Sequence, residues 1–172
     1  MIATLSEKLQ ADRFKQWRLE STGKNYLISD GPNPPDFYFD LSDRKGWLEV
    51  TDVFENNDEA KFRYCKISRY SFSGLPDQIG LFLINQLQKK LSNPSYRRVY
   101  EERGKGILLL TCESIAFDVV NLARIEEALV AFQPMNDLGF FATAYFEYDL
   151  ERERYYRLIY GREEIRGQLL DD

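Results

Sequence analysis

The sequence predicts a single mixed α/β (α+β) domain, in which a central sheet of mixed strand direction is flanked by helices. Two patterns favour this fold class. Residues 5–20, 77–91 and 121–132 carry apolar side chains at helical spacing, whereas residues 35–53 and 106–112 alternate or are continuously apolar, as strands are. The order is helix, three strands, helix, strand, then helix and two strands, which is typical of helices packed on a sheet.

The composition is that of an ordinary globular protein. The 172 residues suffice for one domain, 1–172, with a real core, and 44% are hydrophobic and 30% charged. Two cysteines form no framework, which favours a reducing compartment. There is no leader pattern and no apolar run long enough for a bilayer, so we expect a cytoplasmic protein without a membrane partner.

The absence of histidine limits the chemistry. It excludes Ser-His-Asp and Cys-His catalysis as well as zinc held by histidine. A site in which carboxylates bind a hard cation needs no histidine and is therefore still possible. The net charge of −5 argues against bulk electrostatic attraction to nucleic acid but leaves room for a local basic patch.

The first predicted element is a helix over residues 5–20. On a helical wheel its apolar face consists of Leu5, Leu9, Phe14 and Trp17. Glu20 falls in the same arc, close in angle to Leu9. It is either a helix-end acid that reaches solvent or an acid directed at a site between helix and sheet. A turn and a short strand at 25–29 follow.

A hairpin carries the most informative acids. A proline-rich loop at 31–35 leads into it, Asp36 opens its first strand and Glu49 lies in its second. Side chains alternate between the faces of a strand, so Asp36 shares a face with Asp40, and Glu49 shares one with Thr51. The alternation lets Asp36 and Glu49 point to the same side of the sheet, whereas Asp52 should face away from Glu49.

The clearest helix is predicted over residues 77–91, after a long polar and aromatic connection at 55–76. Its apolar face consists of Ile79, Leu83, Ile84, Leu87 and Leu91. Lys90 lies inside that face and Lys89 on the opposite side. Lys90 is therefore either an inward-looking lysine or one that snorkels at the helix end.

The rest of the chain is predicted to begin with a polar link at 93–106, a buried strand at 106–112 and a helix at 121–132. Two aromatic strands at 140–148 and 155–160 and a polar end at 163–172 follow. Arginine and tyrosine are interleaved at 63–70, 96–100 and 152–157, as they are where proteins contact phosphates and stack on bases. The alternative is a solvated surface, which the acids at 147–153 favour for the last stretch.

These residues carry a resemblance to a known family. Pro35–Asp36, followed by Glu49–Val50–Thr51 on the next strand, resembles the PD-(D/E)XK nuclease-like (restriction-endonuclease-like) superfamily, and the αβββαβ order over residues 5–112 is similar to its core. The resemblance implies that Asp36 and Glu49 bind Mg²⁺ or Mn²⁺ and that Glu20 on the first helix is an auxiliary acid.

One position departs from that family. Its motif has a lysine two residues after the third-strand acid, where this chain has Thr51. That lysine orients or activates the attacking water and stabilises developing charge, which threonine cannot do. Some members carry the lysine on the following helix instead, where Lys90 stands here. Without such a replacement the site would be inactive.

The resemblance implies a Mg²⁺-dependent endonuclease that hydrolyses phosphodiester bonds of DNA or RNA. Its catalytic residues would be Asp36, Glu49, Lys90 and Glu20, and its expected partners are nucleic acid and a second copy of the chain. One alternative is a catalytically inactive nuclease fold that binds nucleic acid or protein. The other is an unrelated α/β domain whose hairpin acids are surface residues.

Overall fold

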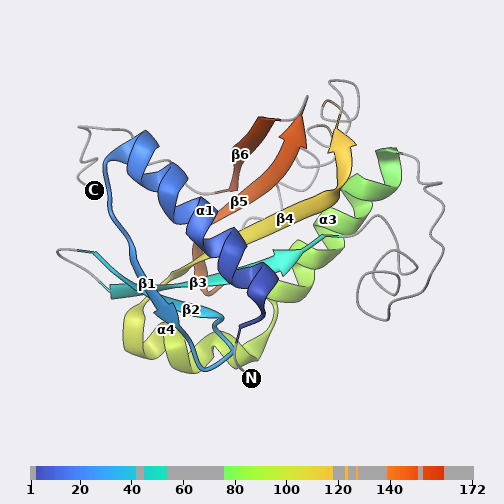
Figure 1. The fold of residues 1–172 in the computed structure, drawn as a ribbon. Helices are drawn as coiled ribbons and strands as arrows, with labels where there is room; N and C mark the ends of the chain where they lie inside the picture. Colours follow the sequence, from blue (N-terminus) through green and yellow to red (C-terminus); the bar gives the residue numbers. More distant parts are fainter. Residues whose placement is uncertain are drawn as a thin grey trace, which may run out of the picture.

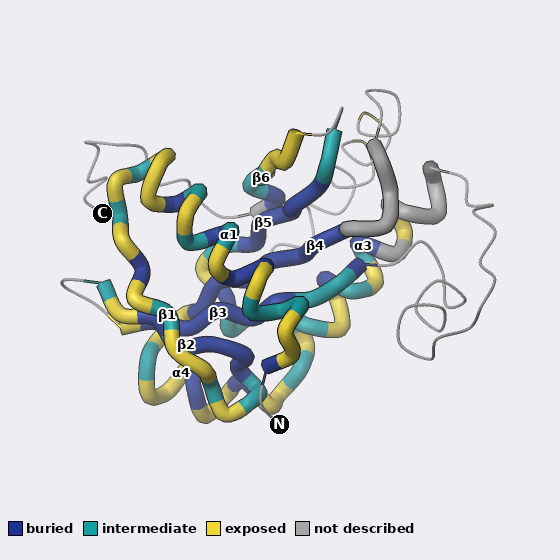
Figure 2. Tube along the Cα trace, viewed as in Figure 1, coloured by how far each residue is buried: buried dark blue, intermediate teal, exposed yellow. Residues whose placement is uncertain are grey.

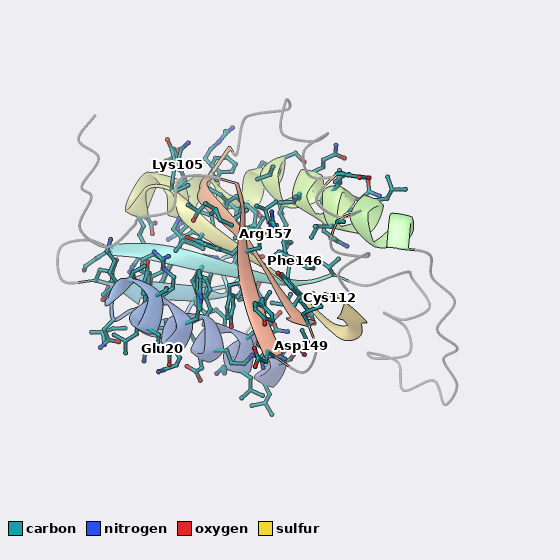
Figure 3. The ribbon with its side chains drawn as sticks, turned by 90° about the horizontal axis from the view of Figure 1, so that it is seen from above. Glu20, Lys105, Cys112, Phe146, Asp149 and Arg157 are labelled. Carbon is teal, nitrogen blue, oxygen red and sulfur yellow. The ribbon has the colours of Figure 1, made fainter. Side chains whose placement is uncertain are left out.

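The computed structural model describes residues 3–41, 45–53, 76–117, 139–150 and 153–160, with Ala123 and Glu127. The connection predicted at 55–76 lies outside these ranges except for Pro76, as do the end at 163–172 and all but two residues of the helix predicted at 121–132. Within the described part, one six-stranded sheet has α1 on one face and α3 on the other (Figures 1 and 3). No described helix is long and apolar enough to span a membrane.

The sheet is mixed, as predicted, and its strands lie side by side in chain order. The strands are β1 (Leu27–Asp30), β2 (Phe37–Asp40), β3 (Lys45–Asp52), β4 (Gly106–Phe117), β5 (Phe141–Leu150) and β6 (Glu153–Tyr160). Antiparallel pairs join β1 to β2, β2 to β3 and β5 to β6, whereas β3–β4 and β4–β5 are parallel. The first half of β4 is buried on both faces, which explains its continuous apolar run (Figure 2).

The alternation of β3 assigns its residues to two separate cores. Trp47 packs with Leu83 and Leu87 of α3 (Pro76–Leu91), whereas Leu48 and Val50 pack in the core beneath α1 (Leu5–Thr22). Odd-numbered residues of β3 therefore face α3, and even-numbered residues face α1.

The apolar face predicted for α1 is wrong in phase. Leu5 and Leu9 are 76% and 52% exposed, and the buried residues are Gln10, Ala11, Phe14 and Arg18. The sheet beneath α1 carries aromatic side chains, and Phe14 and Arg18 of the helix pack against them. The Arg18 guanidinium carbon lies 5.6 Å from the ring centre of Tyr145, a cation–π contact that a wheel of apolar residues does not anticipate.

The polar link predicted at 93–106 contains two further helical segments, η1 (Pro94–Tyr96) and α4 (Arg97–Arg103). Asn93 starts η1, because its side-chain oxygen accepts a hydrogen bond from the Ser95 amide at 3.0 Å and Pro94 follows in a favoured position. Only Tyr96 and Val99 are buried in these two segments. Two apolar contacts are too few for a helical periodicity to appear in the sequence.

Candidate metal centre

The candidate centre lies on the α3 face of the sheet, where β2 begins beside the middle of β3. Phe37 pairs with Leu48 in the antiparallel register, so Asp36 continues the ladder next to Glu49. Paired residues point to the same face. Asp36 and Glu49 are each only 3% exposed, so the two acids are neither surface residues nor on opposite faces of the sheet.

The proline-rich loop holds Asp36 in place. The Gly31 amide donates to the Asp36 carbonyl at 2.7 Å, and the Val50 amide donates to the Asp36 carboxylate Oδ2 at 2.9 Å. A Cβ atom on Gly31 would lie 2.2 Å from the Pro35 carbonyl oxygen, so the loop closes only with glycine there. Backbone contacts therefore fix both the position and the orientation of the Asp36 side chain.

The Glu49 carboxylate is asymmetric in its contacts. Its Oε1 accepts from the Lys90 ammonium at 2.5 Å and from the Tyr96 hydroxyl at 2.8 Å. Its Oε2 is buried and has no hydrogen-bond partner among the described residues. Lys90 comes from the last turn of α3, and the Tyr96 ring stacks on Trp47 with ring centres 5.4 Å apart. Glu49 is thus gripped through one oxygen only.

The two carboxylates are under-compensated in charge. Burial, and then the neighbouring Glu49, raise the pKa of Asp36 to about 7, although the Val50 amide and Lys90 act in the opposite direction. Burial and Glu49 also raise the pKa of the Tyr96 hydroxyl, which keeps it protonated and able to donate. Among the described residues, Lys90 is the cation that contacts the pair. The site favours additional positive charge.

A second buried acid shows the contrast. Glu147 on β5 accepts from Arg13 at 2.9 Å and from Arg154 at 2.7 Å through its Oε1. Burial still raises its pKa, but both guanidinium groups lower it. Glu147 Oε2 is likewise buried without a hydrogen-bond partner among the described residues. The difference lies in the charges: Arg13 and Arg154 contact Glu147, and Arg154 also pairs with Asp149 at 2.8 Å, whereas at the candidate centre one ammonium contacts Glu49 beside Asp36. The Glu147 cluster is therefore a compensated ion-pair network.

Replacing Tyr96 with phenylalanine tests the grip on Glu49. The variant keeps the ring against Trp47 but removes the hydroxyl that donates to Glu49 Oε1. A buried acceptor that loses a donor destabilises a protein by about 1–3 kcal/mol. We expect a loss of that size in urea-induced unfolding, and an unchanged unfolding midpoint would show that the hydrogen bond contributes nothing.

Of the four predicted site residues, three come together and one does not. Asp36, Glu49 and Lys90 share the α3 face, and Lys89 is exposed on the other side of its helix. Glu20 is exposed at the far end of α1 and accepts from the Gln16 amide at 2.7 Å (Figure 3). The structure does not bring Glu20 to the carboxylate pair, because its arc on α1 is the solvent face.

A different acid of α1 acts on the centre. Glu7 raises the pKa of Asp36 through its charge. It also closes the capping box at the start of the helix, where its Oε2 accepts from the Thr4 amide at 2.6 Å. The one sequence signal that could point to Glu7 is its spacing of three residues from Thr4, as in a capping box. Tyr96 was missed because its place depends on η1, which the sequence did not predict.

Two matched variants separate these acids. Gln can close a capping box as Glu does, so Glu7→Gln should keep α1 intact while lowering the pKa of Asp36. Glu20→Gln should leave that pKa unchanged, because the side chain points to solvent. Titration of the Asp36 carboxyl carbon by NMR measures both effects, and an equal shift in the two variants would refute the assignment of Glu7.

Asp52 faces α1, as the alternation predicts. Its Oδ1 accepts from the side-chain amide Nε2 of Gln10 and from the Thr111 hydroxyl, both at 2.7 Å. No group of three or more potential metal-binding acids, cysteines or histidines occurs in the part of the chain that the structure describes. The protein ligands of a cation here would be the pair Asp36 and Glu49, with water or substrate completing the shell.

In comparisons with known proteins, no protein-family model, no curated protein and no solved structure matches the chain.

Proposed function

We propose that this protein is a metal-dependent phosphodiester hydrolase that acts on nucleic acid. The observation that carries the proposal is the buried pair Asp36 and Glu49. Lys90 contacts Glu49 Oε1, and Glu49 Oε2 is buried without a hydrogen-bond partner among the described residues. The two carboxylates lie on one face of a sheet, and little positive charge compensates them. Such a pair suits a divalent cation, because hard cations bind carboxylate oxygens.

The residues fit Mg²⁺ or Mn²⁺. Mg²⁺ is commonly held by one or two carboxylates, with water and substrate phosphate as its other ligands. Asp36 and Glu49 would hold the ion, and the Thr51 hydroxyl, buried on the same face without a partner among the described residues, lies two positions further along β3. Such an ion, when bound, supplies an activated water and neutralises charge on a phosphate.

The strand arrangement supports a nuclease-like core. Among the described elements, α1 precedes three antiparallel strands, α3, η1 and α4 follow, and β4 then pairs parallel to β3. With η1 and α4 as additions before β4, and with α1 and α3 on opposite faces, this order agrees with the αβββαβ core of the PD-(D/E)XK resemblance of Asp36 and Glu49. We infer that the chain is a divergent member of that superfamily.

Lys90 takes the role of the missing motif lysine in this proposal. Its ammonium reaches Glu49 Oε1 from the helix that follows the hairpin, whereas Thr51 carries no charge. An ammonium at this point can orient a water or a substrate phosphate oxygen and stabilise negative charge as it develops. Tyr96 acts through Glu49 as a positioning residue.

Calorimetric titration with Mn²⁺ tests the proposal. The wild-type protein should bind with a dissociation constant in the micromolar range, and Asp36→Ala should weaken binding at least 100-fold. The wild type, but not the variant, should cleave single- or double-stranded DNA or RNA when Mn²⁺ is present. Equal cleavage by the two proteins, with circular dichroism showing both folded, would refute it.

The metal affinity should depend on pH. The pKa of Asp36 lies near 7, so below that value Mn²⁺ must displace a proton from the carboxyl group. We expect the dissociation constant to rise about tenfold for each pH unit below 7 and to level off above it. Titrations at pH 5.5, 6.5 and 8 measure this slope, which a site with an ordinary aspartate would not show.

The alternative is a catalytically inactive nuclease fold that binds a nucleic acid or a protein. The observation that favours it is the Lys90 ammonium, which already occupies Glu49 Oε1 while Thr51 replaces the motif lysine. In this case the ammonium is a permanent substitute for the cation. The wild type would then bind no Mn²⁺, and divalent ions would leave its unfolding unchanged.

A further inference from the structure

A cleft of about 310 Å³ lies between the proline-rich loop and α4. It is lined by Pro32, Asn33, Pro34, Tyr38, Ser95, Arg98, Val99 and Glu102. Tyr38 follows Asp36 by two residues and therefore points to the same face of β2. Ser95 directly precedes Tyr96, whose hydroxyl binds Glu49. The cleft thus lies on the α3 face of the sheet, and its lining includes Tyr38, two residues along the chain from Asp36.

The walls of the cleft combine ring side chains with polar side chains. Two prolines, Pro32 and Pro34, and the aromatic residue Tyr38 belong to the lining. The Arg103 guanidinium carbon lies 3.9 Å from the centre of the Tyr38 ring, and Arg103 also pairs with Asp40 at 3.6 Å. These contacts fix the tyrosine ring before any ligand arrives. A rigid aromatic wall favours a planar ligand.

The rim supplies hydrogen-bonding groups of both kinds. Arg98 donates through Nε to Glu102 Oε1 at 3.0 Å, and its side chain is 89% exposed. A guanidinium has about five N–H donors, so this ion pair leaves others for a ligand. Glu102 and Asn33 add acceptors. The charges of Arg98 and Glu102 cancel, so the cleft has little attraction for a bare phosphate.

We propose that this cleft binds one unpaired base of the nucleic acid on which the carboxylate pair acts, an inference that rests on the proposed function. Its volume lies at the lower end of the range for small-molecule pockets, about 300–1,000 Å³. That volume suits a single base with its sugar. The ring of Tyr38 serves stacking, and the polar residues of the rim serve the donor and acceptor edge of a base.

The test is an NMR titration of the ¹⁵N-labelled protein with AMP, GMP, CMP and UMP in the presence of EDTA. At least one nucleotide should shift the amides of Asn33, Ser95 and Val99, and its dissociation constant should be at least tenfold lower than that of ribose 5-phosphate. Equal binding of ribose 5-phosphate would indicate a phosphate site and overturn the inference, as would no binding at 10 mM.

Variants of neighbouring exposed residues sharpen the test. Arg98→Ala should weaken nucleotide binding at least fivefold, whereas Arg97→Ala should leave it unchanged, because Arg97 is exposed on α4 but does not line the cleft. Ser95→Trp should block the cleft and abolish binding. An equal effect of the two arginine variants, or binding that survives Ser95→Trp, would overturn the inference.

The absence of metal separates this test from that of the proposed function. Asp36→Ala should bind nucleotide as well as the wild type does. Mn²⁺-dependent cleavage without any nucleotide binding in the cleft would overturn this inference alone. Nucleotide binding in a protein that takes up no Mn²⁺ would support the cleft as a base site while refuting the hydrolase.

Discussion

Replacing Asp36 with asparagine is expected to stabilise the protein above pH 7 and to remove most of its pH dependence between about 4 and 7. The pKa of Asp36 is raised from 3.8 to about 7, so folding favours the protonated form of this acid. The stabilisation is present below pH 4 and is lost as pH rises through 7. Each pKa unit corresponds to about 1.4 kcal/mol, so the wild type should lose at most about 4.5 kcal/mol.

Asparagine keeps the geometry of the site, because its side-chain oxygen can still accept from the Val50 amide. Urea-induced unfolding of the wild type and Asp36→Asn at pH 4, 6 and 8 measures the difference. The two proteins should be similar at pH 4 and diverge at pH 8. With 1 mM Mn²⁺ the difference in free energy of unfolding between the two proteins should become smaller or change sign, since only the wild type gains stability from a bound ion. Parallel pH profiles would refute the raised pKa.

Replacing Lys90 with methionine is expected to destabilise the protein strongly in the absence of metal. The change removes the ammonium from Glu49 Oε1 and leaves the Tyr96 hydroxyl as the one donor to this buried carboxylate in the part of the chain that the structure describes. Breaking a buried ion pair by removing one partner destabilises by about 3 kcal/mol. Methionine fills a similar volume, so the loss reports charge compensation.

Lys89→Met is the matched control, since Lys89 is exposed one residue earlier on α3. It should change the free energy of unfolding by less than about 0.5 kcal/mol. Mn²⁺ should restore much of the stability that Lys90→Met loses, because the ion supplies the missing positive charge, but it should not restore cleavage. Equal effects of the two lysine variants would show that the pair does not depend on Lys90.

Much of the fold was predictable because its signals are local. The strands and the helix at Pro76–Leu91 follow from side-chain periodicity, which depends on the backbone of one element at a time. The phase of α1 did not follow, because the sheet beneath it is aromatic and accepts Arg18 in place of leucine. The helix α4 was missed, since a short helix with one buried residue carries almost no periodicity.

The candidate site divides in the same way. Asp36, Glu49 and Lys90 could be brought together from strand alternation and one helical wheel. The influence of Glu7 could not be predicted, because it depends on where the tertiary fold places the first turn of α1 relative to Asp36. The contact of Tyr96 needed a tertiary position that no neighbouring residue indicates. Local geometry found the acids, and only packing revealed what surrounds them.

The acids on both faces of β3 also fix the register of this strand in the sheet. Apolar residues occur on either side of this strand, so hydrophobic burial alone would tolerate a slip of one residue against β2 and β4. Such a slip would turn Glu49 toward the rings beneath α1 and take Asp52 away from Gln10 and Thr111. Both misplaced carboxylates would be buried without partners. The same charges that make the site costly to bury therefore exclude the misaligned sheet.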